Sequence, residues 1–228
     1  MRPFRGYSVA NYPLRYTDPT GHWTFEEDPE SSTPVQTLTP PTDEERIAAA
    51  RAYRPSAPTM ALPVEGSVTG PFGGHGSEYP AYNYKDKDGN LVPYYHPGQD
   101  RHADVGTPVR ATKDGIVVAA GDFKKGYGWG VVIRHPGEGG AYTMNYHMQA
   151  ESLFVSPGNV VLAGDPIGLS GDTPQPDTDA HLHWEIVQAG ALTWDKDGMF
   201  HYPAGYYPLS KADLYATRIS PSDWFKAK

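Results

Sequence analysis

Cysteine is absent from the 228 residues of this chain, and that absence excludes several kinds of chemistry. The chain cannot form a disulfide framework, a cysteine-ligated zinc site or a thiol nucleophile. Any metal site must therefore use His, Asp or Glu side chains, and nine histidines are available.

The sequence also lacks long apolar runs and basic clusters. No stretch approaches the ~18 apolar residues of a membrane span, so we expect none. The first residues, MRPFRGY, lack the apolar core of a secretory signal peptide. The formal net charge is −8 and no basic stripe is present, so we expect no nucleic-acid partner.

Helical patterns are scarce, whereas turn-forming residues are common, with 25 Gly and 23 Pro. The best helix candidate covers residues 42–53, where Thr42 and Glu45 form a capping-box pattern. The remaining chain shows short β-prone runs between Gly, Pro and Asp. The expected strands cover residues 67–69, 108–111, 115–120, 130–134, 141–147, 160–163 and 181–187, with a hairpin between 131–134 and 142–147. We predict an all-β fold, a compact antiparallel two-sheet domain, with a mostly irregular N-terminal extension that contains one short helix.

Composition divides the chain into two parts. Residues 1–60 form an N-terminal extension or linker, because residues 28–43 are rich in Pro, Ser and Thr. Residues 61–228 form the β domain, with insertions near 78–95 and 192–218. We expect the polar, tyrosine-rich segment 78–95 to loop out beside the site described next.

The segment His181-Leu-His-Trp-Glu-Ile-Val187 alternates with a period of two. On a strand, one face carries His181, His183, Glu185 and Val187, and the other carries the apolar Leu182, Trp184 and Ile186. The apolar face predicts a core face. The two imidazoles on the first face are close enough to serve one metal centre, and a catalytic zinc needs three protein ligands and one open position.

Further ligand candidates lie upstream. His96 and Asp100 flank a Pro-Gly pair, which predicts a tight turn that brings them together. His147 ends the second hairpin strand. An individual histidine is more often a surface or core residue than a ligand. His102 shares strand parity with Asp100 and is the best substitute ligand, whereas we interpret His135 as structural.

The order of these motifs resembles the lysostaphin/LytM-like family of zinc metallopeptidases. The resemblance covers residues 62–188 and the final residues 221–225. Its motifs are His96-x-Gly98-x-Asp100, Gly106-Thr-Pro-Val109, Tyr127-Gly-x-Gly-Val-Val-Ile133, Tyr146-His147, Gly158-x-Val160-x3-Gly164-x2-Ile167 and His181-Leu-His-Trp-Glu185.

The resemblance implies a role for each matching residue. His96, Asp100 and His183 would bind one Zn²⁺ per chain, and His147 and His181 would act in catalysis without binding metal. Glu185, on the same strand face, would either orient a ligand or lie in solvent. The implied activity is hydrolysis of peptide cross-links in bacterial peptidoglycan, whose peptides would be the partner.

The sequence departs from the family pattern around His147. The family often carries a tyrosine two residues before this histidine, where this chain has Asn145, a candidate groove residue. Strand alternation predicts that Tyr146 faces away from His147. The acidic loop 172–179 before His181 and the insertion 78–95 are also unusual, and we expect them to shape the groove.

The N-terminal residues 7–22 resemble the closing motif of Rhs/YD-repeat core proteins, with residues 13–21 the informative part. In that family the motif precedes a variable C-terminal payload, often an antibacterial toxin. The resemblance implies a payload that acts outside the cell or is delivered to the cell envelope without a signal peptide, together with an immunity protein as a partner.

Two other functions remain open. The first is a non-catalytic module of the same fold that binds the wall or activates an amidase; such modules lack ligand residues, and this chain lacks none. The second is a biotinyl- or lipoyl-like carrier, which the spacing of glycines at 158–167 suggests. No lysine lies in a suitable hairpin turn, which argues against a carrier.

Overall fold

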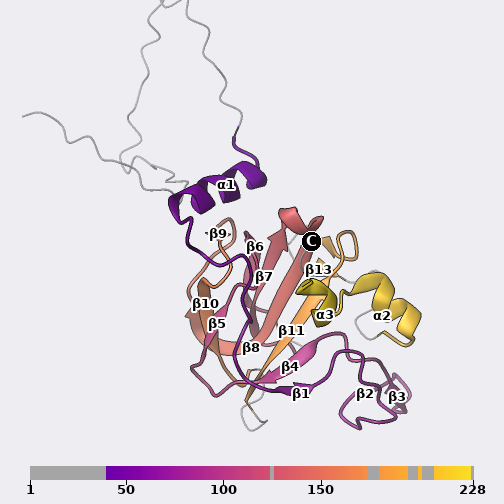
Figure 1. Ribbon diagram of the computed structural model, residues 1–228. Coiled ribbons are helices and arrows are strands. Elements are labelled where there is room, and N and C mark those ends of the chain that lie inside the picture. Colours follow the sequence, from indigo (N-terminus) through magenta and orange to yellow (C-terminus); the bar gives the residue numbers. More distant parts are fainter. Residues whose placement is uncertain (1–39, 124–125, 174–179, 195–199, 202–207, 227–228) are drawn as a thin grey trace, which may run out of the picture.

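The computed structural model describes residues 40–123, 126–173, 180–194, 200–201 and 208–226 (Figure 1). The predicted motif at residues 7–22 and most of the predicted loop 172–179 lie outside these residues. Within them the fold is all-β with a few short helices, as predicted. No helix in this part of the chain has the length and hydrophobicity needed to cross a membrane.

The described strands pair antiparallel, and nine of them form one large sheet. The strands are β1 (Val68–Gly70), β2 (Asn83–Lys85), β3 (Leu91–Pro93), β4 (Gln99–His102), β5 (Pro108–Arg110), β6 (Gly115–Asp122), β7 (Trp129–His135), β8 (Ala141–Leu153), β9 (Val160–Val161), β10 (Pro166–Ser170), β11 (His181–Val187), β12 (Thr193–Trp194) and β13 (Phe200–His201). The helices are α1 (Asp43–Tyr53), η1 (Pro136–Glu138), α2 (Lys211–Thr217) and α3 (Pro221–Trp224). The large sheet runs in the order β1-β4-β11-β8-β7-β6-β9, and β5 and β10 join it through β8. Two separate hairpins are formed by β2–β3 and β12–β13.

Strand β8 connects two layers of the large sheet, one that contains β11 and one that contains β10 and β5. Its residues 142–146 pair with β11, whereas residues 148–153 pair with β10. Between these two regions His147 has a positive φ of 59°. Val109 of β5 and Ile167 of β10 belong to the same buried cluster as Leu182 and Trp184 of β11. One hydrophobic core therefore lies between the two layers.

Strand β11 shows the predicted alternation. Leu182, Trp184 and Ile186 are at most 1% exposed and lie in the core cluster. On the other face, His183 pairs with Asp100 of β4 and with Tyr146 of β8. The pairing of β4 with β11 was not predicted from the sequence, and it brings the two candidate ligand segments side by side.

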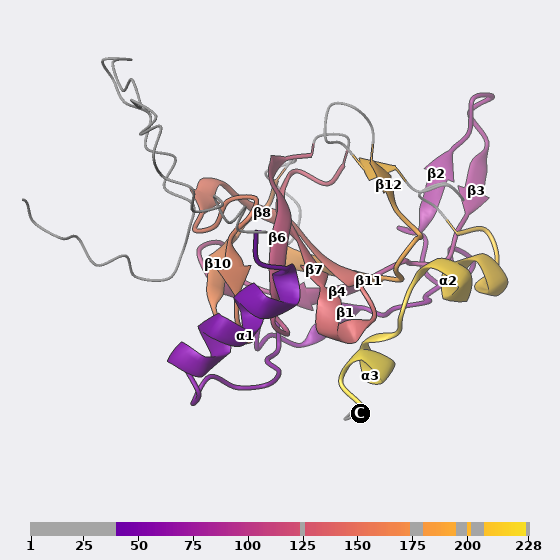
Figure 2. The same cartoon turned by 90° about the horizontal axis from the view of Figure 1, so that it is seen from above.

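Helix α1 begins with the predicted capping box. The Glu45 backbone N–H donates to the Thr42 Oγ1 at 3.2 Å, and the Thr42 N–H donates to the Glu45 carboxylate at 2.7 Å. No residue of α1 is buried. The helix is instead held on the β domain by ion pairs, including Arg51 with Asp114 and Arg54 with Asp165. Although α1 precedes residue 61, it lies beside β6 and β9, at the opposite end of the molecule from β2–β3 (Figures 1 and 2).

The two expected insertions contain secondary structure. Segment 78–95, expected as a loop, contains the β2–β3 hairpin, which projects from the sheet (Figure 2). Asp86 closes its turn by accepting backbone N–H groups of Asp88 and Asn90, both at 2.9 Å. Segment 192–218 contains β12, β13 and α2, and its residues 195–199 and 202–207 lie outside the described part.

Candidate functional site

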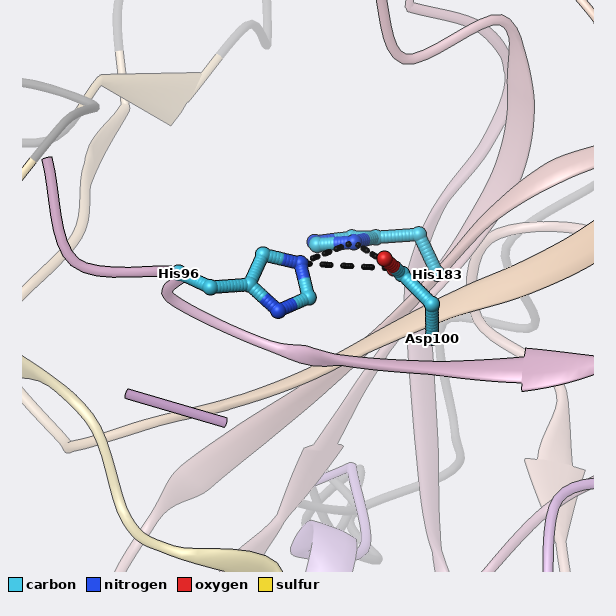
Figure 3. A group of neighbouring side chains, drawn as sticks. All are labelled: His96, Asp100 and His183. Atoms are coloured by element: carbon cyan, nitrogen blue, oxygen red, sulfur yellow. Dashed lines mark hydrogen bonds and ion pairs between the residues drawn. The ribbon is translucent and has the colours of Figure 1, made fainter. Parts of the chain in front are cut away.

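Three side chains from two neighbouring strands form a compact group of possible ligands (Figure 3). His96 precedes β4, Asp100 lies on β4 and His183 lies on β11. The Asp100 Oδ1 is 2.7 Å from the His183 Nδ1 and 3.3 Å from the His96 Nε2. The two imidazole nitrogens are 3.2 Å apart. All three ligand atoms lie within 4.8 Å of one another, so one cation could contact all of them.

Backbone register and small residues produce this close approach. In the antiparallel pair β4–β11, Asp100 lies directly opposite His183. A Cβ atom at Gly98 would lie 2.8 Å from the His183 Nε2 and 2.7 Å from the Trp184 carbonyl oxygen. A side chain at position 98 would therefore displace His183 or its strand, which explains the glycine between the two upstream ligand candidates.

Hydrogen bonds on the far side of each imidazole fix which nitrogen faces the group. The His96 Nδ1–H donates to the Pro71 carbonyl at 3.0 Å, so its Nε2 faces Asp100. The His183 Nε2–H donates to the Glu185 carboxylate at 3.1 Å, so its Nδ1 faces Asp100. Metal-binding histidines usually have such a second acceptor, which orients the ring.

The charges of the group suit a divalent cation. Burial alone would raise the pKa of Asp100, but hydrogen bonds from His183 and His96 hold it well below its usual range. Burial alone would lower the pKa of His183, but Asp100 and Glu185 raise it to about 10. In the absence of a metal ion the carboxylates thus favour positive charge at this point. Two imidazole nitrogens and one carboxylate oxygen are a donor set that zinc accepts.

Two further histidines lie beside this group. The ring centroids of His147 and His181 are 4.8 Å apart, and those of His147 and His183 are 5.9 Å apart. The His147 Nδ1–H donates to the Thr173 carbonyl at 2.7 Å. Burial lowers the pKa of His147 to about 4, so this imidazole is neutral at pH 7. The His181 side chain is 26% exposed.

All five predicted metal and catalytic residues line one pocket of about 190 Å³. Its lining consists of Ala81, Tyr82, Tyr94, His96, Pro97, Asp100, Gly126, His147, His181 and His183. The sequence therefore identified side chains that come together in the structure, although they are spread over residues 96–183.

Tyr82 was not identified from the sequence. Its ring stacks on His96 with centroids 4.3 Å apart and planes 6° apart. Burial, followed by the charge of Asp100, raises the pKa of Tyr82, and its hydroxyl group hydrogen bonds to Asp100. The only signal was the abundance of tyrosine in segment 78–95, which does not indicate which ring faces the site.

Two residues near His147 lie differently from what strand alternation indicates. Asn145 pairs with Val131 and Trp184, so it lies on the core face of β8 and not in the groove. Tyr146 was expected to face away from the site, but it pairs with His183, and their rings are 6.2 Å apart. The positive φ of His147 breaks the alternation, because a residue in this conformation redirects the strand.

The remaining candidates have other contacts. Glu185 is fully buried and contacts both His183 and Arg218. His102, the proposed substitute ligand, is not part of the ligand group. Its side chain is 55% exposed, and its Nε2 lies 3.5 Å from the Asp104 Oδ1. His135 is buried in the hairpin, where it bonds Asp114 and Thr143 as a structural residue.

Comparisons with known proteins agree with this geometry. Residues 94–193 match the model of peptidase family M23. Over 90 residues the chain is 43% identical to the DD-carboxypeptidase/endopeptidase Mpg of Neisseria meningitidis, covering 40% of this chain and 19% of that protein. Over 88 residues it is 42% identical to the murein hydrolase activator EnvC of Escherichia coli, covering 39% of this chain and 20% of that protein. The chain thus spans about a fifth of the length of these curated relatives.

Part of the chain is also similar to a solved structure. A zinc-containing peptidase from Vibrio cholerae is 26% identical, with a TM-score of 0.43, over 57% of this chain and 37% of that one. The family match includes the ligand group, His147 and His181. Residues 94–193 of this chain are therefore similar to peptidase family M23.

Proposed function

We propose that this chain is a zinc-dependent endopeptidase that hydrolyses peptide cross-links of bacterial peptidoglycan. His96, Asp100 and His183 would hold one Zn²⁺ per chain. The observation that carries the proposal is the convergence of this ligand group with His147 and His181 on one pocket. Peptidoglycan is the substrate supported by the M23 match and by the name of a relative from Vibrio cholerae, the peptidoglycan DD-endopeptidase ShyA, which is 36% identical over 95 residues.

The two other histidines provide the acid–base chemistry. A zinc ion, when bound, would polarise the scissile carbonyl and make a water molecule more acidic. His147 donates its Nδ1–H to Thr173, so its lone pair is on Nε2, and the neutral ring can accept a proton from the attacking water. His181, beside it and partly exposed, would donate to the developing oxyanion or to the leaving amine.

Substitution of one residue of each class tests these roles. His181→Ala should keep zinc and lose activity, because the ligand group is untouched. Asp100→Ala should lose both zinc and activity. Zinc content and the release of new amino termini from purified walls are the measurements. Equal zinc loss in the two variants would contradict the division of roles.

The second candidate function is a non-catalytic module that binds wall or activates an amidase. The similarity to EnvC, which is named a murein hydrolase activator, is the observation that favours it. The complete ligand group argues against it. A module of this kind would stimulate a separate amidase equally well as wild type and as His181→Ala, and would release no amino termini by itself.

The finer hypothesis of a delivered antibacterial toxin rests on residues 13–21, which lie outside the described residues and outside the family match. It predicts action in the cell envelope and an immunity protein that neutralises the chain. Expression in the cytoplasm should be tolerated, whereas expression with an added export signal should lyse the cells. Lysis from the cytoplasm, or none after confirmed export, would contradict it.

A further inference from the structure

Arg218 contacts the site from behind, through Glu185. We infer that Arg218 is a positioning residue for the metal centre, which holds the Glu185 carboxyl group in the orientation that turns the His183 Nδ1 toward the metal. The inference rests on the proposed function, because it requires His183 to be a ligand. It adds to the site a residue that lies beyond the segment matched to the family.

Three buried side chains form a continuous series of contacts. The Arg218 Nε–H donates to the Glu185 Oε2 at 3.2 Å, and the Glu185 Oε1 accepts from the His183 Nε2–H at 3.1 Å. The His183 Nδ1 then lies 2.7 Å from Asp100. Arg218 is 1% exposed and Glu185 is 0% exposed. Contacts of this kind are strong where water is excluded.

The backbone fixes Arg218 beside β11. Arg218 forms a bridge with Val187, and the Ile219 N–H donates to the Ile186 carbonyl at 2.9 Å. The Arg218 N–H donates to the Leu214 carbonyl at 2.8 Å, at the end of α2. The guanidinium also donates to the Thr217 Oγ1 at 2.7 Å. Helix α2 and the segment that follows it therefore place the cation behind the ligand strand.

This arrangement has a direct consequence for metal binding. An acceptor on the outer nitrogen of a ligand histidine fixes the tautomer and the ring orientation, and its loss typically lowers metal affinity about 10–100-fold. The contact with Arg218 holds the second oxygen of Glu185 and so fixes the orientation in which the first oxygen accepts from His183. Without Arg218, the buried Glu185 would lose a compensating charge and would turn or recruit another partner.

Zinc affinity of folded variants separates a positioning role from a general stabilising one. The variants are Arg218→Met, Arg218→Lys, Glu185→Gln and the double variant Arg218→Met/Glu185→Gln, measured by competition with a chelator. We expect Arg218→Met to weaken zinc binding at least about tenfold, as for other residues behind a ligand, and Arg218→Lys to recover part of the loss. The double variant should bind zinc no more weakly than the weaker single variant, because both residues act through one contact with His183.

Arg101→Met provides the matched control. Arg101 lies on β4 next to Asp100, but it pairs with Leu182 on the core side of the sheet, and its Nε–H donates to the Val64 carbonyl at 3.2 Å. Its loss removes a partly buried arginine from the same strand as a ligand and should leave zinc affinity unchanged.

Nitrogen-15 NMR of the zinc-loaded wild type gives a result that requires no variant. The His183 ring should carry its proton on Nε2 and bind zinc through Nδ1. The opposite tautomer would overturn the inference. Wild-type zinc affinity in Arg218→Met, or strictly additive losses in the double variant, would overturn it as well. If the wild type bound no zinc, the proposed function and this inference would fail together, whereas the other outcomes overturn the inference alone.

Discussion

The dependence of stability on pH should contain a large contribution from His135. This side chain is fully buried at the end of β7. Its Nδ1–H donates to the Asp114 carbonyl at 2.8 Å, and its Nε2 accepts from the Thr143 hydroxyl at 2.8 Å. Both nitrogens are therefore satisfied in the neutral ring. Burial lowers the pKa of His135 to about 4 from its usual 6.5.

The sign of the effect follows from these two pKa values. Between pH 6.5 and about 4 the unfolded chain binds a proton at this residue and the folded chain does not. The stabilisation is therefore complete above pH 6.5 and is lost progressively as the pH falls to about 4. The pKa values differ by about 2.5, and one pH unit corresponds to about 1.4 kcal/mol, so the loss is about 3 kcal/mol.

Urea unfolding of wild type and His135→Gln from pH 7 to pH 4 measures this contribution. The variant starts less stable, and the difference should shrink by about 3 kcal/mol as the pH falls. Other titrating groups are common to both proteins and cancel in the difference. Thr143→Val is the control, because it removes a hydrogen bond but keeps the imidazole, so its profile should parallel that of wild type. A parallel profile for His135→Gln would refute the reasoning.

Two further predictions concern contacts that hold the site and the N-terminal helix. Thr173→Val loses a hydroxyl that donates to the Met148 carbonyl at 2.7 Å, which should loosen the Thr173 carbonyl that orients His147. Wall hydrolysis should fall about tenfold with zinc content unchanged, since a general base contributes about 10²–10⁴-fold. Thr173→Ser should restore the hydrolysis. Unchanged hydrolysis in Thr173→Val would contradict this role. Arg51→Met breaks one of the ion pairs that hold α1, so the helix, which buries no residue, should loosen and limited proteolysis near residues 54–58 should become faster. Equal cleavage rates would show that the remaining ion pairs are sufficient to hold it.

Local patterns indicated candidate residues for the site because the relevant signals are short, whereas the division into ligands and catalytic residues came from the family resemblance. Alternation with a period of two needs only the seven residues of β11 to place His183 and Glu185 on one face and Trp184 on the other. The capping box of α1 spans Thr42 to Glu45 and is equally local. Such features depend on backbone geometry and on side chains a few residues apart, so they need little contribution from distant parts of the chain.

Alternation failed where one residue departs from strand geometry. A positive φ at His147 turns the strand, so Tyr146 and His147 both approach His183, and Asn145 faces the core. A non-glycine residue in this conformation is costly and is found where surrounding contacts enforce it. Here the His147 N–H donates to the Tyr127 carbonyl at 3.0 Å, a contact that no local pattern predicts.

Residues distant in the sequence were also missed. Arg218 follows Glu185 by 33 residues and reaches it only because the chain after α2 pairs with β11. Tyr82 contacts His96 because it lies at the base of the β2–β3 hairpin, where the Tyr94 N–H donates to the Tyr82 carbonyl at 3.0 Å. Both contacts depend on the path of the chain between elements, for which neither composition nor periodicity contains a signal.

Mass spectrometry of fragments released from purified walls tests the central claim most directly. Zinc-loaded protein, the same protein after chelation, and His181→Ala would be incubated with walls of different cross-link chemistry. The proposed function predicts new amino termini within the peptide cross-links of at least one wall type, lost after chelation and regained when zinc is restored. Zinc-loaded protein that releases no new amino termini from any wall would contradict it.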